Sequence, residues 1–137
     1  MNIKRFRNTC LTYFLVVHDE NFDLKDFCDL LDLDYDYYLQ FNTVDFLEIG
    51  RNEIYNVNIN EMIRITLQDL FGKVDMLNKL KEKYNLTYYL ERVPSLVESS
   101  DEPTPILSLE SDIIEFLYKT NTIDDLDYYI AAIYEDE

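Results

Sequence analysis

Runs of strand-forming residues alternate along this chain with apolar patterns of helical spacing, and this alternation is what most restricts its fold. Residues 9–18 and 86–93 are rich in β-branched and aromatic side chains, which predicts a strand in each. A last strand is expected at about 126–134, and residues 135–137 are expected to fray. Between the second and the last of these runs, residues 94–105 contain prolines, serines and acids and predict an exposed loop.

The middle of the chain predicts a pair of strands joined by a tight turn. Residues 40–49 and 52–59 alternate loosely between apolar and polar side chains. Gly50, Arg51 and Asn52 lie between them and are typical of a hairpin turn.

Three segments carry apolar residues at helical spacing. The first, residues 21–31, has Asn21 or Asp23 as a capping residue. A longer apolar stripe follows a capping sequence that begins at Asn58, and Gly72 is expected to kink or divide this helix. The third helix is expected after Ser108 or Ser111, either of which could cap it.

These elements give the order β-α-β-β-α-β-α-β and predict the α+β class. We expect one largely antiparallel sheet with about three amphipathic helices packed against it. The chain of 137 residues is long enough for one domain with a real core, so residues 1–137 are expected to form a single domain.

The charge of the chain restricts its partners. Asp and Glu number 28 against 12 Lys and Arg, which gives a net charge of −16. Most of this charge is concentrated in residues 19–48 and 93–137, which carry −9 and −11, whereas residues 49–92 are nearly neutral. Such a chain repels nucleic acid and anionic lipid, so we expect no direct nucleic-acid binding and no membrane association, and we expect a basic protein partner. The sequence leaves a homodimer open.

The compartment is expected to be the cytoplasm. Basic residues precede the apolar segment at 10–17, but no small-residue cleavage site follows it, so a first strand explains the segment better than a signal peptide does. No apolar run approaches the roughly 18 residues needed to span a bilayer. Cys10 and Cys28 lack a CxxC spacing and are expected to be buried, reduced thiols.

Two acidic segments rich in tyrosine are the candidate partner-binding residues. Carboxylates interleaved with tyrosines suit an interface that opposes lysine and arginine, since rings stack on guanidinium groups and carboxylates pair with them. The alternative is a solvated turn in the first segment and an alternating strand in the second, with tyrosines in the core. The candidate residues are Asp32, Asp34, Tyr35, Asp36, Tyr37 and Tyr38, together with Asp124, Asp125 and Asp127.

Catalytic, cofactor and metal sites are not expected. Asp32, Asp34 and Asp36 have the spacing of a calcium loop, but Tyr37 stands where that loop needs glycine. His18 could pair with a cysteine as base and nucleophile, but both cysteines are better explained as core residues. Pairs of acids are unavoidable at this composition and do not indicate a hydrolase.

Most of the chain resembles a family of small bacterial proteins known as domain of unknown function 4279. The resemblance rests on the Lys-rich helix that ends in Tyr84-Asn-Leu, on the segments 104–117 and 123–129, and on the opening strand and helix. Two departures are Tyr55, where the family usually has tryptophan, and the longer and more acidic segment 31–38. The resemblance implies no enzymatic activity. It implies a cytosolic, immunity-like role beside toxins in bacterial conflict.

Charge and resemblance together predict a non-enzymatic inhibitory binding protein, similar to an immunity protein, that blocks a basic, nucleic-acid-acting protein. One alternative is a phage anti-defence protein of the anti-CRISPR type that mimics nucleic acid. A second alternative is an intracellular structural or regulatory module whose acidity only keeps it soluble.

Overall fold

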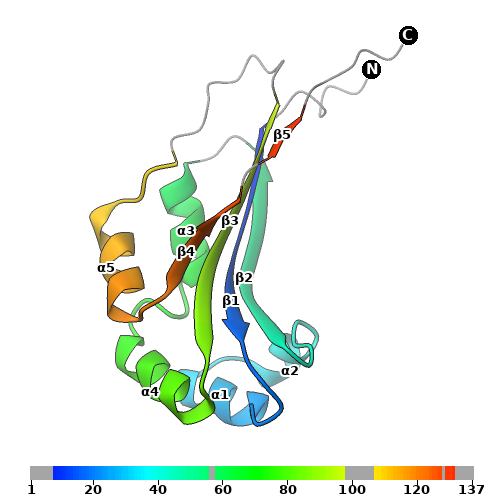
Figure 1. Ribbon diagram of the computed structural model, residues 1–137, viewed down its shortest axis with the longest axis vertical. Helices are drawn as coiled ribbons and strands as arrows, with labels where there is room; N and C mark the ends of the chain where they lie inside the picture. Colours follow the sequence, from blue (N-terminus) through cyan, green and yellow to red (C-terminus); the bar gives the residue numbers. More distant parts are fainter. Residues whose placement is uncertain (1–7, 56–57, 98–106, 128, 132–137) are drawn as a thin grey trace.

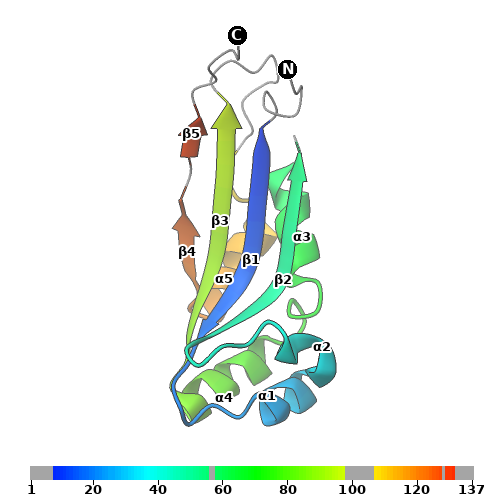
Figure 2. The ribbon, with the colours of Figure 1, turned by 90° about the vertical axis from the view of Figure 1, so that its right-hand side faces the viewer.

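A computed structural model describes residues 8–55, 58–97, 107–127 and 129–131, and it has the α+β architecture expected from the sequence. A single sheet forms one layer, with helices packed against one of its faces and around one end (Figures 1 and 2). In chain order the elements are β1 (Thr9–Val17), α1 (Leu24–Leu31), α2 (Tyr35–Leu39), β2 (Phe46–Tyr55), α3 (Ile59–Leu67), α4 (Val74–Tyr84), β3 (Thr87–Val97), α5 (Ser111–Lys119), β4 (Ile123–Leu126) and β5 (Tyr129–Ala131).

The long strand pairings of the sheet are antiparallel, as expected, but the sheet is mixed because two short strands at one edge are parallel to their neighbour. Its order is β2-β1-β3-β4, and β5 pairs with β3 beyond β4. β1 is antiparallel to both of its neighbours, whereas β4 and β5 run parallel to β3. The reason is the connection through α5, which returns the chain to the starting end of β3, as a crossover to a parallel strand requires.

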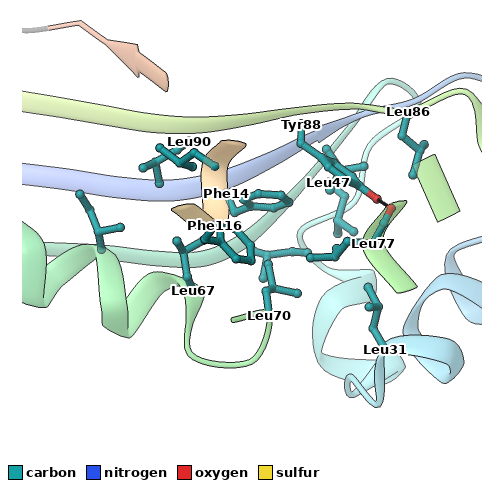
Figure 3. Close-up of a cluster of buried hydrophobic side chains, with 14 of the residues drawn as sticks. Phe14, Leu31, Leu47, Leu67, Leu70, Leu77, Leu86, Tyr88, Leu90 and Phe116 are labelled. Carbon is teal, nitrogen blue, oxygen red and sulfur yellow. Dashed lines mark hydrogen bonds between the residues drawn. The ribbon is translucent and has the colours of Figure 1, made fainter. Parts of the chain in front are cut away.

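The core lies between the sheet and the helices. Along β1 the even-numbered residues are buried and the odd-numbered ones are half-buried, so only one face of the strand meets the helices. Phe14 packs against Tyr88 of β3 and Phe116 of α5, with ring centroids 5.1 and 6.4 Å apart. The Tyr88 hydroxyl donates a hydrogen bond of 2.7 Å to the Leu77 carbonyl of α4, which ties the sheet to that helix (Figure 3).

Both cysteines belong to this core, as expected. Cys10 is 5% exposed and Cys28 is fully buried, and both are free thiols. Burial raises the pKa of each thiol to about 11.

The predicted hairpin at Gly50 is wrong. Gly50 lies inside β2, which runs unbroken from Phe46 to Tyr55 along β1. The pairing shifts by one residue between Thr12 and Phe14, so that Gly50 and Arg51 together face Tyr13 in a β-bulge. Gly50 has φ of +70°, and a Cβ atom there would lie 2.1 Å from the Thr66 carbonyl oxygen of α3. The glycine therefore allows α3 to pack closely against β2. It does not form the hairpin turn that its sequence context suggested.

The predicted loop after residue 93 is wrong in its first four residues. β3 continues through Pro94 to Val97, and the rest of the expected loop, 98–105, lies outside the described residues. On its outer edge, β3 pairs with β4 up to Arg92 and with β5 from Ser95 onward. Pro94 falls in the gap between the two, where it has no N–H to offer a neighbour. In place of the single last strand expected at 126–134, the described residues form two short strands, β4 and β5, and residues 128 and 132–137 lie outside the described part of the chain.

The helices differ from expectation in number and in one cap. Asp23 caps α1 and Asn58 caps α3, and the long helix is divided around Gly72 into α3 and α4. The short helix α2 was not predicted. Neither Ser108 nor Ser111 caps α5. The N-cap residue is Glu110, which donates its backbone N–H to the Asn60 side-chain oxygen at 2.8 Å.

Candidate interaction surface

One face of the sheet carries none of the described helices. In Figure 2 this face is turned toward the viewer, and α3 and α5 lie behind the strands. The odd-numbered residues of β1 point to it because the even-numbered ones fill the core. Leu11, Leu15 and Val17 are accordingly half-buried, and Phe46 of β2 is 45% exposed. We call this surface the open face.

A row of polar and charged side chains crosses the open face. Tyr13 of β1 pairs with Glu91 of β3, and Glu91 pairs in turn with Asp125 of β4. Burial, a hydrogen bond with Asp125 and the negative charges of Asp125 and Asp127 raise the pKa of Glu91 to about 7. Near neutral pH Glu91 is therefore protonated for part of the time, and in that form it is able to donate a hydrogen bond to Asp125.

The other end of the row holds a cation. The Arg51 guanidinium lies over the Tyr13 ring, 5.4 Å from its centroid, and its Nη1 donates to both Glu48 carboxylate oxygens at 3.2 and 3.3 Å. Burial and the charges of Glu91 and Glu48 raise the pKa of Tyr13, and Arg51 acts in the opposite direction. Tyr13 is thus the ring around which the charged groups of three strands gather.

A pocket of about 410 Å³ opens where the open face meets the loop after α2. Its lining includes Tyr13 and Leu15 of β1, Phe46 and Glu48 of β2, and Phe41 and Thr43 of the loop. Backbone bonds hold this loop against β2, since Glu48 donates to the Phe41 carbonyl at 3.2 Å and Thr43 donates to that of Phe46 at 2.7 Å. The pocket is aromatic with one carboxylate.

The first acidic segment adjoins this pocket. Tyr37 is 50% exposed, and its ring lies 5.1 Å from that of Phe41 in the pocket wall. Tyr35 is half-buried under the Lys25 ammonium, whose nitrogen lies 5.5 Å from the ring centroid. Tyr38 belongs to the core, and burial raises its pKa to about 12.

The three acids of this segment are exposed, and two of them shape the backbone. Asp32 ends α1 in a left-handed conformation with φ of 56°. The Asp34 carboxylate accepts the Tyr37 backbone N–H at 3.2 Å and so caps α2, and Asp36 lies in the first turn of that helix. The Asp34 carboxylate therefore has a structural role as the helix cap, as Asp and Asn side chains often do.

The second acidic segment is divided between two faces of the sheet. The Asp124 carboxylate accepts two hydrogen bonds, at 2.8 and 2.7 Å, from Arg92, whose side chain is 4% exposed. Asp125 is exposed on the open face beside Glu91, and the Asp127 backbone N–H donates to the Arg92 carbonyl at 2.9 Å. The sheet order places this segment beside β3 and α2 beside β2, so the two acidic segments lie toward opposite edges (Figure 2).

His18 has a structural setting. Its ring stacks on Phe22 at 4.2 Å, and its two nitrogens contact the Asn42 side-chain oxygen at 2.8 Å and the Asp19 carbonyl at 3.2 Å. Within the described ranges, no group of three or more His, Cys, Asp or Glu side chains is placed to hold a metal ion.

Sequence reasoning did not find Tyr13, Glu48 or Glu91. Each lies in a segment predicted as a strand, but alternation within one strand does not show which strand lies beside it or in which register. Only the pairing across β1, β3 and β4 brings these side chains together with Asp125.

Comparison with known proteins adds no relative from which a site could be transferred. No family model, no curated protein and no solved structure matches this chain. In the described part of the chain, no helix has the length and apolar character needed to cross a membrane. The resemblance to domain of unknown function 4279 therefore stays a prediction from sequence motifs.

Proposed function

We propose that this protein is a non-enzymatic inhibitory binding protein, similar to an immunity protein, that blocks a basic, nucleic-acid-acting protein. The observation that carries the proposal is the open face, where half-buried apolar side chains of β1 lie beside the acidic groups Glu48, Glu91 and Asp125. The pocket and the exposed acids of α2 extend this surface toward the β2 edge.

The composition of the open face fits protein docking. Each square ångström of apolar surface removed from water contributes roughly 25 cal/mol, so covering Leu11, Leu15 and Phe46 favours association. The acidic groups steer a basic partner into place and disfavour acidic ones. A net charge of −16 strengthens this selection over the whole molecule.

The carboxyl pair of Glu91 and Asp125 suits binding better than catalysis. An acid with a pKa near 7 beside a carboxylate is able to donate a proton, as catalytic acids do. Catalytic acids act inside a concave site that holds the substrate, and neither Glu91 nor Asp125 lines the pocket. Glu91 is only 9% exposed whereas Asp125 beside it is exposed, so a partner cation would reach the pair through the Asp125 carboxylate.

Affinity capture followed by mass spectrometry tests the proposal. The bait is the full chain, compared with a face variant (Glu48→Gln, Glu91→Gln and Asp125→Asn) and with a control variant (Asp75→Asn, Glu82→Gln and Glu115→Gln). Each variant replaces three acidic side chains by neutral amides, and the control positions are exposed on α4 and α5. We expect a basic protein to be retained by the wild type and the control and to be lost by the face variant.

The captured protein also separates the alternatives. A toxin that acts on nucleic acid supports the immunity role, and a nuclease of a phage-defence system supports the anti-defence role. If the three baits retain the same proteins, the open face is not the docking surface, and acidity that serves only solubility, as in a structural or regulatory module, becomes the better explanation.

A further inference from the structure

We propose that the pocket beside the open face receives an arginine side chain of the basic partner. This inference rests on the proposed function and names the chemistry that the partner must present. It is drawn from the walls of the pocket and from a guanidinium group of the chain itself, which already lies at the pocket rim.

The lining of the pocket offers apolar side chains for the stem of an arginine and polar groups for its guanidinium head. Leu15, Phe41 and Phe46 supply apolar surface for the three methylene groups of the stem. Tyr13 offers a ring face, and the Glu48 carboxylate offers two acceptor oxygens for a planar fork of N–H donors. No lysine or arginine is among the lining side chains of this pocket, and the cation that contacts its polar groups from outside is Arg51.

Arg51 shows that the rim of the pocket accepts a guanidinium. Its head group stacks over Tyr13 and bonds Glu48, the two polar groups that the pocket would present to a partner. The geometry of the pair is weak, because a single nitrogen reaches both oxygens at more than 3.1 Å and the Arg51 side chain is 47% exposed. An exposed pair of this kind contributes little to stability, so a partner group is able to displace Arg51 at small cost. Arg51 thus acts as an internal ligand that a stronger external one replaces.

The pocket favours arginine over lysine. A guanidinium is flat and weakly hydrated, stacks on aromatic rings and donates two parallel bonds to one carboxylate. A lysine ammonium is compact and strongly hydrated, and would gain one bond to Glu48 while losing more water. Two further acids, Glu91 and Asp125, act electrostatically on Tyr13, and a negative charge on either attracts a cation.

The experiment measures binding of a small probe, N-acetyl-arginine amide, to the isotope-labelled full chain by NMR titration at physiological salt. The citrulline analogue has the same shape without the charge and serves as the probe control. Two substitutions at the site are matched in charge with substitutions elsewhere: Glu48→Gln with Glu82→Gln, and Arg51→Gln with Lys25→Gln. All four positions are exposed or half-exposed, and the amide spectrum reports directly whether each variant is folded.

Substitutions of Glu48 and of Arg51, the two partners of one ion pair, are expected to change the affinity for arginine in opposite directions. Glu48→Gln should weaken arginine binding about fivefold relative to Glu82→Gln, because the bidentate acceptor is lost. Arg51→Gln should tighten it about threefold relative to Lys25→Gln, because the internal competitor is gone. Saturable shifts should centre on Tyr13, Phe41 and Glu48, and citrulline should produce none of them.

Three results would overturn the inference: shifts spread over acidic residues of all elements, equal weakening by Glu48→Gln and Glu82→Gln, or no preference for arginine over citrulline. Any of them leaves the proposed function standing, provided that affinity capture still retains a basic protein in a manner that depends on the open face. Failure of that capture, with arginine binding intact, contradicts the proposed function instead.

Discussion

At the scale of single residues, Gly50 is a position where the backbone conformation and the neighbouring helix leave no room for a side chain. Its φ of +70° and the 2.1 Å approach of the Thr66 carbonyl to an added Cβ both oppose any side chain. We predict that Gly50→Ala lowers the free energy of unfolding by at least about 3 kcal/mol, because the clash is with backbone that cannot rotate away. Chemical denaturation monitored by circular dichroism measures the loss.

Gly72 provides the matched control for this substitution. An added Cβ there has no atom within 4 Å. Gly72→Ala should therefore leave stability unchanged or raise it by about 0.5 kcal/mol, since alanine restricts the unfolded chain. Equal stability of the two alanine variants would contradict the role of Gly50 in joining β2 to α3.

The two buried thiols lead to a second prediction at this scale. Cys10 and Cys28 are almost inaccessible, and their pKa values of about 11 leave little of the reactive thiolate at neutral pH. We expect maleimide to label both slowly in the native protein and rapidly in denaturant, as followed by mass spectrometry. Rapid labelling of either thiol under native conditions would show that the core opens around it.

At the scale of elements, Arg92 and Asp124 hold β4 to the sheet. Arg92 is 4% exposed, and besides Asp124 its guanidinium bonds the Leu107 carbonyl. Asp124→Asn leaves this buried cation without its counter-charge, so we predict a loss of about 2 to 3 kcal/mol in the free energy of unfolding. Loss of hydrogen-exchange protection confined to β4 and the facing residues of β3 would be the local signature.

Asp125 is the natural comparison, because it is next in the chain but lies on the open face. Asp125→Asn removes a negative charge beside Glu91 and should leave stability within about 1 kcal/mol of the wild type. If both asparagine variants were equally destabilised, the division of this segment into a structural acid and a surface acid would be wrong.

The pairing of β3 with β4 also makes stability depend on pH. Glu91 titrates at about 7 in the folded protein, above the ordinary value of 4.5, so the folded state binds more protons between these values. Stability should therefore fall as pH rises from about 4.5 to about 7, by up to roughly 3 kcal/mol from this group, and level off above. In Glu91→Gln this part of the loss should disappear, whereas the exposed control Glu82→Gln should keep it. Denaturation curves of the wild type and both variants at pH 5 and pH 8 measure this difference in stability.

Patterns within one element were predictable from sequence, and contacts between elements were not. β1, α1 with its Asp23 cap and α3 with its Asn58 cap follow from local spacing and capping chemistry. Gly50 was misread because its function depends on Thr66, sixteen positions away along the chain. The open-face row was missed for the same reason, since strand register exists only in the folded sheet. Of the residues proposed from sequence, Asp125 is the one that the sheet places in that row.

At the scale of the whole molecule, the two candidate acidic segments lie toward opposite edges of the sheet. The segment around α2 lies beside β2, and the segment of β4 lies beside β3 at the far edge of the sheet. The open face lies between them, so a basic partner that approaches this face meets negative potential on both sides. Long-range attraction of this kind raises the association rate more than it slows dissociation.

This arrangement makes the acids of the α2 segment a test of steering, once a partner is in hand. We predict that replacing Asp32, Asp34 and Asp36 together by asparagine preserves the fold. Asparagine tolerates the left-handed conformation at residue 32, and its side-chain oxygen still caps α2 at residue 34. The association rate should fall severalfold at low salt, and the difference from the wild type should shrink as salt rises, with dissociation almost unchanged. Surface plasmon resonance at two salt concentrations, with the Asp75→Asn, Glu82→Gln and Glu115→Gln variant as control, measures both rates. If the two triple variants associate equally fast, the charge around α2 acts only through the net charge of the molecule, and the partner does not approach the pocket from that side.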